Sequence, residues 1–320
     1  MTWLVTGGAG YIGAHLVRAL REDGVDVVVL DDLSSGHREF VPDGVPLVQA
    51  SVTDLPVVTR TLRDHAVQGV VHLAGFKYAG VSVQRPLHTY EQNVVGTLRL
   101  VQAMAETGVD NIVFSSSAAV FGTPDVDLVT EQTPTGPESP YGESKLVGEW
   151  LLRDQAAANP LQHTSLRYFN VVGSGYAELY DTSPHNLFPI VMKVLGEGGV
   201  PQINGDDYPT PDGTCVRDYI HVADVAAAHA VAARVLAGGG ELQPVYNLGS
   251  GQGLSVREIL DAILRVTGSD VVPVVTGRRP GDPARIVASG ELAARDLDWR
   301  LRHDLDDMVD SAWRAWQLAR

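Results

Sequence analysis

Leu4-Val5-Thr6-Gly7-Gly8-Ala9-Gly10-Tyr11-Ile12-Gly13 is the stretch that decides the fold, because it joins an apolar run to three spaced glycines and the start of a helical pattern. In a Gly-x-x-Gly-x-x-Gly turn, the glycines let the backbone approach a pyrophosphate and let the helix pack closely on the sheet. The N-terminus of the helix then stabilises the negative charge of the phosphates. The stretch therefore predicts a dinucleotide-binding turn between the first strand and the first helix.

Short β-rich runs alternate with longer helical patterns through the rest of the first half. Continuous apolar runs bounded by turns suit strands that are buried on both faces, hence a parallel sheet. This alternation predicts an α/β fold with a doubly wound parallel sheet. Strands are expected at Trp3–Val5, Val27–Leu30, Leu47–Gln49, Gly69–Leu73, Asn111–Ser115, Ser165–Tyr168 and Val245–Leu248, and helices at Tyr11–Asp23, Thr89–Thr107, Val256–Val266 and from Leu305 to Trp316.

The rhythm changes after Asn170, where loops rich in Gly, Ser, Asp and Pro replace the regular alternation. We therefore expect a dinucleotide-binding domain over residues 1–170 and a smaller substrate-binding lobe mainly over residues 171–320. Segments around residues 220–250 are expected to pack back on the first domain.

An acidic residue at the end of the second predicted strand favours one cofactor. A carboxylate at Asp31 hydrogen-bonds the adenosine ribose and repels a 2′-phosphate, so the sequence predicts NAD rather than NADP. Asp32 is an alternative for that role. The segment Leu73-Ala74-Gly75 is expected to approach the second half of the dinucleotide, with Lys77 and Asn93 as further polar contacts.

Tyr141 and Lys145 lie four residues apart, so on a helix they share one face. A positive ammonium beside a phenol favours the phenolate, which lowers a pKa that is normally about 10. Such a pair can accept a proton near neutral pH. By itself the pair is as consistent with two surface residues of no consequence, and the upstream glycine motif favours the catalytic reading.

Composition excludes several other classes. The formal net charge of −15 argues against non-specific nucleic-acid binding. The single cysteine, Cys215, excludes an intramolecular disulfide, and without a His/Cys cluster no metal site is expected. No apolar run approaches the ~20 residues that cross a bilayer. No basic segment followed by an apolar signal core begins the chain, so we expect a cytoplasmic protein without a membrane partner.

Several motifs together resemble one family. The glycine turn, Ser115-Ser116-Ser117 and Tyr141-x-x-x-Lys145 resemble the extended short-chain dehydrogenase/reductases. Within them, the chain resembles the UDP-galactose 4-epimerases over essentially its whole length. The segments that carry this closer resemblance are His72–Lys77, Ser139–Gly142, Leu166–Asn170, Asp207–Val222 and Arg278–Asp282.

The resemblance implies an isomerase that oxidises C4 of a UDP-hexose, such as UDP-galactose or UDP-glucose, and returns the hydride to the opposite face, with NAD as a recycled cofactor. It implies Ser117, Tyr141 and Lys145 as the catalytic set and a homodimer formed through two helices per subunit. The implied cofactor contacts are Gly7, Gly10, Tyr11, Ile12, Gly13, Asp31, Asp32, Leu33, Ser51, Val52, Leu73, Ala74, Gly75, Lys77, Asn93, Ser115, Tyr141, Lys145 and Tyr168. The implied substrate contacts are Lys77, Ser117, Tyr141, Asn170, Asn186, Leu187, Asn204, Arg217, Tyr219, Arg279 and Asp282.

By the resemblance, Arg217 and Arg279 hold the diphosphate and Asp282 the uridine ribose. Two guanidinium groups suit phosphate oxygens because each offers a planar set of donors. The chain departs from the family pattern at Asn204, where an aromatic residue is usual. Arg285 lies near a family position at which the size of the side chain helps to decide whether an N-acetyl group fits, so the preference between hexose and N-acetylhexosamine is open.

The sequence leaves one alternative to UDP-hexose 4-epimerisation open and disfavours two others. An epimerase of UDP-N-acetylhexosamine or UDP-glucuronate remains open, the latter through Arg285 as a cation for the carboxylate. A 4,6-dehydratase is disfavoured because Ala118-Ala119 stands where that family carries Asp-Glu. A non-catalytic NAD-sensing module is disfavoured because both Tyr141 and Lys145 are present.

Overall fold

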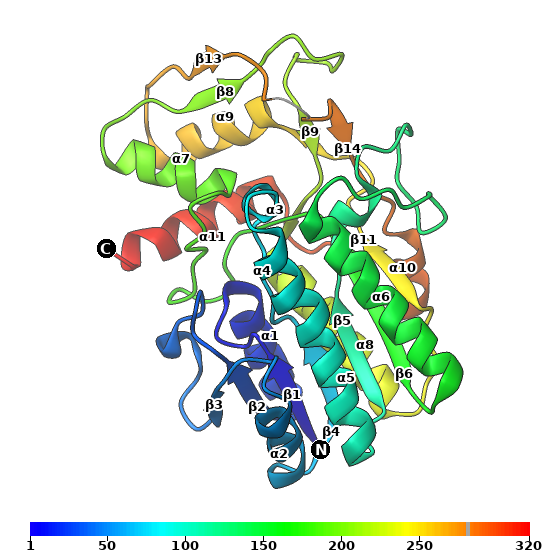
Figure 1. Ribbon diagram of the computed structural model, residues 1–320. Coiled ribbons are helices and arrows are strands. Elements are labelled where there is room, and N and C mark those ends of the chain that lie inside the picture. Colours follow the sequence, from blue (N-terminus) through cyan, green and yellow to red (C-terminus); the bar gives the residue numbers. More distant parts are fainter. Residues whose placement is uncertain (280–281) are drawn as a thin grey trace.

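The computed structural model describes residues 1–279 and 282–320. Its centre is a seven-stranded parallel sheet in the order β11-β6-β5-β4-β1-β2-β3, as the sequence predicted (Figure 1). Six of these strands follow the 3-2-1-4-5-6 order of dinucleotide-binding folds. The strands span β1 Thr2–Thr6, β2 Asp26–Asp31, β3 Leu47–Gln49, β4 Val67–His72, β5 Asn111–Ser115, β6 Gln162–Tyr168 and β11 Val245–Leu248.

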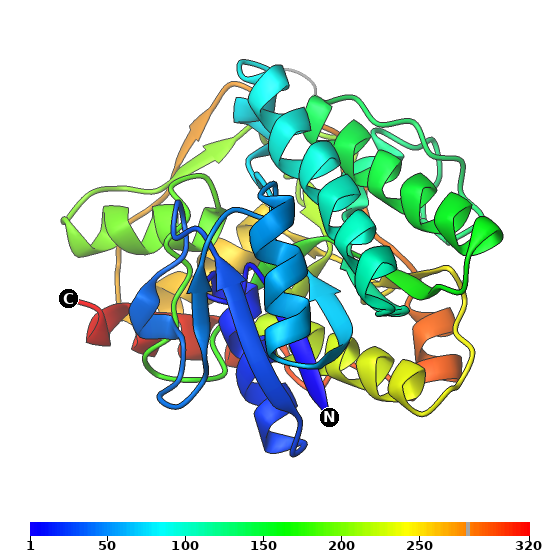
Figure 2. The same cartoon turned by 60° about the horizontal axis from the view of Figure 1, so that its bottom comes forward.

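Helices cover both faces of this sheet, because its strands are apolar on both sides (Figures 1 and 2). Residues of α1 and α8 pack against one face around Trp3 and Tyr246, and residues of α2, α5 and α6 pack against the other around Leu100 and Leu152. The covering helices span α1 Tyr11–Glu22, α2 Leu55–Asp64, α5 Gly96–Thr107, α6 Pro140–Ala158, α8 Val222–Ala237 and α10 Glu291–Leu297.

The helix predicted over residues 89–107 contains a change of helical type. The short helices α3 Ala79–Ser82 and α4 Pro86–Tyr90 lead into a π-helical turn, η2 Glu91–Val95, which continues as α5. Single π turns inside α-helices are frequent at functional sites. This turn carries Asn93, which is buried.

A smaller lobe sits beyond the carboxyl ends of the sheet strands (Figure 1). Its core joins α7, α9 and α11 around Phe188, Ile259 and Met308. The lobe and its connections contain β7 Asn170–Val172, α7 Leu187–Gly196, β8 Gln202–Asn204, β9 Val216–Arg217, β10 Tyr219–His221, β12 Leu254–Ser255, α9 Val256–Thr267, β13 Val274–Thr276, β14 Arg285–Ile286 and α11 Leu305–Leu318. The remaining short elements are the 3-10 helices η1 Arg38–Phe40 and η3 Ala118–Phe121.

The chain returns to the sheet after it has entered the smaller lobe. Strand β11 is hydrogen-bonded to β6 in register Val245↔Ser165 to Leu248↔Tyr168, and α8 packs on α1. Strand β11 and helix α8 therefore lie against elements formed by the first 170 residues. The boundary at residue 170 itself stays a prediction.

Candidate active site

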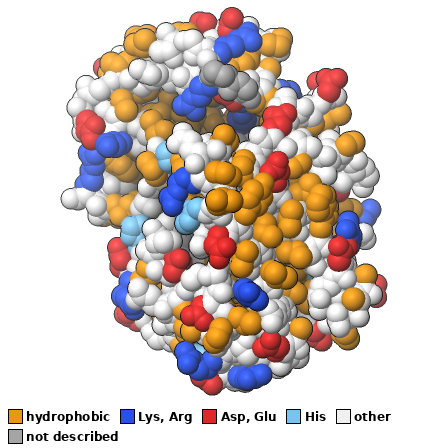
Figure 3. Space-filling view, in the orientation of Figure 1, with side chains coloured by type: hydrophobic (Ala, Val, Ile, Leu, Met, Phe, Trp, Pro, Cys, Tyr) orange, Lys and Arg blue, Asp and Glu red, His pale blue; other side chains and the backbone are white. Residues whose placement is uncertain are grey.

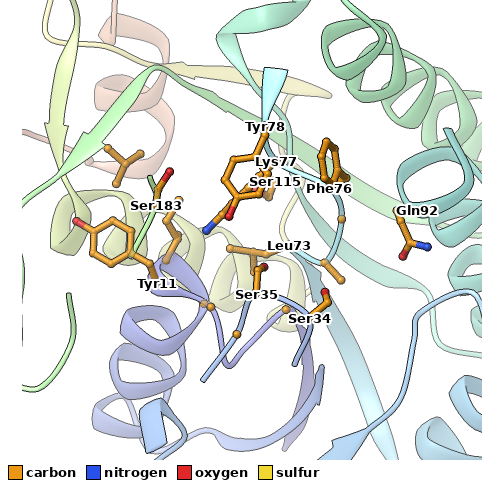
Figure 4. Close-up of a pocket in the computed structure, with 18 of the residues that line it drawn as sticks. Tyr11, Ser34, Ser35, Leu73, Phe76, Lys77, Tyr78, Gln92, Ser115 and Ser183 are labelled. Atoms are coloured by element: carbon orange, nitrogen blue, oxygen red, sulfur yellow. The ribbon is translucent and has the colours of Figure 1, made fainter. Parts of the chain in front are cut away.

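One cavity of about 650 Å³ lies between the sheet and the smaller lobe. Tyr11, the first residue of α1, and Leu73, which directly follows β4, face it together with Ser183 of the smaller lobe (Figure 4). Its position beyond the carboxyl ends of β1 and β4, where the strand order reverses, is where open α/β sheets bind ligands. The predicted site residues that line it are Gly7, Gly10, Tyr11, Ile12, Gly13, Asp31, Asp32, Ser51, Val52, Leu73, Ala74, Gly75, Lys77, Ser115, Tyr141, Lys145, Tyr168, Asn170, Asn186, Leu187 and Tyr219.

The glycine turn at one end of the cavity fits a dinucleotide. A Cβ atom on Gly7, whose φ is +74°, would lie 2.7 Å from the backbone nitrogen of Ala74, and one on Gly13 would lie 2.1 Å from the carbonyl oxygen of Gly7. Only glycine permits the two strand ends to approach so closely. Helix α1 begins at this turn with no side-chain cap on its first N–H groups. Those groups suit the pyrophosphate of NAD.

Asp31 holds the backbone around this turn. Its carboxylate accepts hydrogen bonds from the backbone nitrogens of Ala9 (3.0 Å) and Leu33 (2.8 Å). Burial raises the pKa of Asp31, while these two hydrogen bonds lower it. A carboxylate has about four lone-pair sites, so it keeps capacity for ribose hydroxyls. Leu33 itself, with φ +61°, forms the turn and does not line the cavity.

Asn93 lies beneath the cavity wall rather than in it. Its Oδ1 accepts a hydrogen bond from the backbone nitrogen of Phe76 (2.6 Å), and its Nδ2 donates to the carbonyl of Phe76 (3.0 Å) and to Ser144 Oγ (2.8 Å). It thereby fixes the loop that carries Lys77 against the start of α6. Asn93 therefore supports the loop beside the cavity, and its contact with the cofactor stays a prediction.

Ser117, Tyr141 and Lys145 come together at the carboxyl end of β5. Ser117 caps the short helix η3, and its hydroxyl lies close enough to the Tyr141 phenol to lower the pKa of that phenol. The Lys145 ammonium lies 5.9 Å from the centre of the Tyr141 ring and donates to the carbonyl oxygen of Ser115 (2.8 Å). Tyr141 and Lys145 line the cavity, whereas Ser117 is half-buried behind it.

The pKa of Tyr141 differs from the expectation that Lys145 lowers it. Burial raises this pKa, and the neighbouring Ser117 hydroxyl opposes that rise in part. Burial also lowers the pKa of Lys145 to about 8, which weakens its charge as an electrostatic partner. The prediction of a depressed tyrosine pKa is therefore wrong for the protein chain taken by itself, because desolvation outweighs the neighbouring ammonium.

Four of the predicted substrate residues of the smaller lobe, Asn204, Arg217, Arg279 and Asp282, form two pairs of their own. Arg217 makes an ion pair with Asp282 rather than with its neighbour Asp218. The Asn204 amide, oriented to satisfy its neighbours, accepts from Arg279 Nε (3.1 Å). None of the four lines the cavity, although Tyr219, two residues beyond Arg217, does. Pro280 and Gly281 of the predicted Arg278–Asp282 motif lie outside the described residues.

Arg285 points its guanidinium at backbone oxygens. It donates to the carbonyls of Asp127 (3.3 Å) and Gln252 (2.9 Å) and does not line the cavity. Asp218 accepts from the backbone nitrogens of Ser250 and Ala288, so it is a structural anchor between loops.

Several cavity residues were missed in the sequence analysis. Ser34, Ser35 and Gly36 directly follow Asp31 and Asp32, so the position of a loop after the acidic strand end was the available signal. The others come from loops and short helices whose position depends on the tertiary fold, and they include Phe76, Tyr78, Arg85, His88, Gln92, Phe169, Val171, Val172, Asp181 and Ser183.

The structure also bears on a metal site and on a membrane crossing. Within residues 1–279 and 282–320, His, Cys, Asp and Glu side chains form no group of three or more suited to a metal ion. None of the helices in the part of the chain that the structure describes combines the length and apolar character that a membrane crossing requires.

Comparisons with known proteins place this geometry in a family. Residues 3–249 match the sequence model of the NAD dependent epimerase/dehydratase family. The chain belongs to this family. Its member from Azospirillum brasilense, named UDP-glucose 4-epimerase, is 44% identical over 315 residues, which cover 97% of this chain and 90% of that protein.

Solved structures of the NAD dependent epimerase/dehydratase family superpose over nearly the whole chain. A UDP-glucose 4-epimerase from Stenotrophomonas maltophila, with bound NAD and formylated UDP-arabinopyranose, is 40% identical with a TM-score of 0.94, covering 100% of this chain and 98% of that one. One from Brucella ovis in complex with NAD is 39% identical with a TM-score of 0.93, covering 98% and 97%.

Proposed function

We propose that this chain catalyses the NAD-dependent 4-epimerisation of a UDP-hexose, interconverting UDP-galactose and UDP-glucose. The observation that carries the proposal is the arrangement of one cavity, in which the glycine turn after β1 and the Tyr141–Lys145 pair of α6 face the same space. Relatives that match nearly the full length of the chain, and are named UDP-glucose 4-epimerase, support it.

The bound cofactor supplies the chemistry of taking a hydride from C4 and returning it to the opposite face. The chain supplies the proton transfer. Tyr141, as phenolate, accepts the proton of the 4-hydroxyl, and Ser117 donates a hydrogen bond to the same oxygen as charge develops there. Lys145 contributes a positive charge beside the phenolate. Because burial opposes ionisation of Tyr141, this positive charge and that of the oxidised cofactor must together offset the burial.

Epimerisation also requires firm binding at the nucleotide and freedom at the hexose, because the keto sugar must present its other face. We propose that Arg217 and Arg279 bind the diphosphate when substrate enters. Their present partners, Asp282 and Asn204, lie on the same small lobe and are themselves predicted substrate contacts. A guanidinium that exchanges a carboxylate for a phosphate keeps its charge paired.

The two alternative hexoses remain outcomes of one experiment. Arg285, the cation expected to bind the carboxylate if the substrate is UDP-glucuronate, donates to two backbone carbonyls outside the cavity. The pure protein should be incubated with UDP-galactose, UDP-N-acetylgalactosamine and UDP-galacturonate, and each 4-epimer quantified. We expect interconversion of UDP-galactose with UDP-glucose, while failure to convert any of the three would reject the proposed function.

We also propose that the protein is a homodimer through the exposed face of α4, α5 and α6. Hydrophobic side chains gather over these helices (Figure 3). Leu87 is 83% exposed, Leu98 45% and Trp150 45%, which is unusual for such large apolar groups on one face. The cytoplasmic location stays a prediction from the sequence.

A further inference from the structure

Three consecutive serines at the carboxyl end of β5 are held by one face of α6. The carbonyl oxygen of Ser115 accepts from Lys145 Nζ (2.8 Å), and Ser116 Oγ donates to Glu149 Oε1 (2.5 Å). Ser117 lies close enough to Tyr141 to lower the pKa of its phenol. The three helix residues are spaced four apart, so they occupy successive turns. Glu149 is thus the third member of a row whose first two members are catalytic.

Glu149 is also fixed from the sheet. Arg167 of β6 donates from Nε to Glu149 Oε1 (2.8 Å) and from Nη2 to Oε2 (2.6 Å), a two-point pairing of the fork with the carboxylate. Only 5% of Arg167 and 6% of Glu149 is exposed. The guanidinium further lies 4.8 Å from the centre of the Phe121 ring. The carboxylate therefore has one geometry and does not reach the cavity itself.

The surroundings of Lys145 give this carboxylate an electrostatic role. The groups packed near its ammonium from other elements are His72 of β4 and His229 of α8, whose pKa values burial lowers to about 3 and about 4, so both are neutral. Tyr141 lies on its own helix. Glu149 is the carboxylate whose charge raises the pKa of Lys145 against burial, among the residues that the structure describes.

We infer that Glu149 is a positioning residue of the active site, which, clamped by Arg167 and Ser116, holds the Ser115–Ser117 segment in register with α6 and places a fixed negative charge one turn beyond Lys145. The inference rests on the proposed function for its kinetic consequences, but its structural part does not. Without this charge, the lysine beside the catalytic tyrosine would lose its proton at lower pH.

The direct test is a pH titration of Lys145 by nuclear magnetic resonance. The chain has only three lysines, Lys77, Lys145 and Lys193, so ¹³C-labelled lysine gives three side-chain signals, and Lys145→Met assigns one of them. The double variant Glu149→Gln/Arg167→Gln removes both charges together, so that neither is left buried without a partner. We expect its Lys145 midpoint to lie below that of the wild type, because Glu149, rather than its partner Arg167, is the charge that acts on this ammonium.

The kinetic test uses a milder pair of variants. Ser116→Ala removes the hydroxyl that ties the strand end to Glu149, and we expect kcat to fall about tenfold with KM within about twofold, because the interaction positions groups that act in the transition state. Ser165→Ala is the matched control, since this serine is equally buried on β6 but its Oγ has no partner among the described residues. We expect its kcat to remain that of the wild type.

The outcomes separate the inference from the proposed function. Coinciding Lys145 midpoints in the wild type and the double variant would overturn the charge role, and an unchanged kcat in Ser116→Ala would overturn the positioning role. If the double variant does not fold, Glu149→Gln is titrated in its place, by the same criterion. If the wild-type protein epimerises no UDP-sugar while the double variant still has the lower Lys145 midpoint, the proposed function is rejected and the charge role stands.

Discussion

Tyr141 is the residue at which the proposed chemistry is decided. Tyr141→Phe keeps the ring and removes the proton acceptor, so we expect kcat to fall by about 10²–10⁴-fold while bound NAD is retained. Turnover with UDP-galactose and the NAD content of the purified variant check this. Tyr90→Phe is the control, because its phenol bonds Glu143 and does not line the cavity. Wild-type-like turnover of Tyr141→Phe would reject the assignment.

Arg217 tests whether an ion pair seen in the protein chain becomes a substrate contact. Arg217→Gln removes the charge-assisted hydrogen bonds proposed for the diphosphate, each worth roughly 1.5–3 kcal/mol. We expect KM for the UDP-sugar to rise about 10–100-fold with kcat nearly unchanged, as for a contact made equally in ground and transition states. Arg314→Gln, which breaks the exposed pair with Asp310, should leave both constants unchanged. A KM unchanged by Arg217→Gln would remove this residue from the binding site.

For single residues, the sequence predicts which side chains can do chemistry better than it predicts which side chains they contact in the folded protein. Tyr141 and Lys145 are visible because they are four apart on one helix. The pairing of Arg217 with Asp282 joins residues that are distant in sequence, so only the folded lobe reveals it. The sign of the Tyr141 pKa shift was missed for the same reason, since burial depends on groups that the local sequence does not name.

The π turn η2 shows how one element supports the site from below. Asn93→Ala would leave the backbone N–H and C=O of Phe76 without their partners, and we expect the free energy of unfolding to fall by about 2 kcal/mol. Retained NAD should fall as well, because the Lys77 loop loses its support. Urea unfolding and cofactor content measure the two effects. Asn159→Ala, at the exposed end of α6, is the control; equal losses in both variants would contradict this role.

Among the elements, strands were the easier prediction. All seven strands of the main sheet correspond to runs identified from apolar pattern, within a few residues at their ends. The change of helical type at η2 was not predicted, because a π turn follows from one extra residue in the hydrogen-bond ladder and leaves the apolar period almost unchanged. The loops that complete the cavity were missed, since they have no periodicity.

Four buried histidines make the stability of the whole molecule sensitive to acid. Burial lowers the pKa of His15 and His229 to about 4 and that of His72 and His221 to about 3. Below the usual value of about 6.5 the unfolded chain binds protons that the folded protein does not, so stability falls as the pH falls from there towards 3. At pH 5.5 the loss is about 1.4 kcal/mol per histidine and roughly 5 kcal/mol together.

Urea unfolding at pH 7.5 and pH 5.5 measures this loss. His229→Leu is the matched variant, because its Nδ1 bonds only Val225 of its own helix and its Nε2 has no partner among the described atoms. We expect the difference in unfolding free energy between the two pH values to shrink by about 1.4 kcal/mol in this variant. An undiminished difference would show that His229 ionises in the folded protein.

The proposed dimer is a prediction about the molecule as a unit. Leu98→Glu and Trp150→Glu place charges in the exposed apolar face of α5 and α6, and we expect monomers by light scattering coupled to size exclusion, where the wild type gives twice that mass. Val272→Glu, an 81% exposed valine on the smaller lobe, should leave the mass unchanged. A monomeric wild type at micromolar concentration would contradict the dimer.

The position of β11 at the edge of the main sheet has a consequence for biosynthesis. A nascent chain that has emerged only to residue 200 already contains β1 to β6, yet the edge of β6 remains open and α1 lacks its neighbour α8. An unpaired strand edge with an uncovered apolar face invites association with other chains. The main sheet therefore cannot be completed on the ribosome until α8 and β11 have been translated, after the first elements of the smaller lobe. Chains truncated before β11 should need chaperones or aggregate.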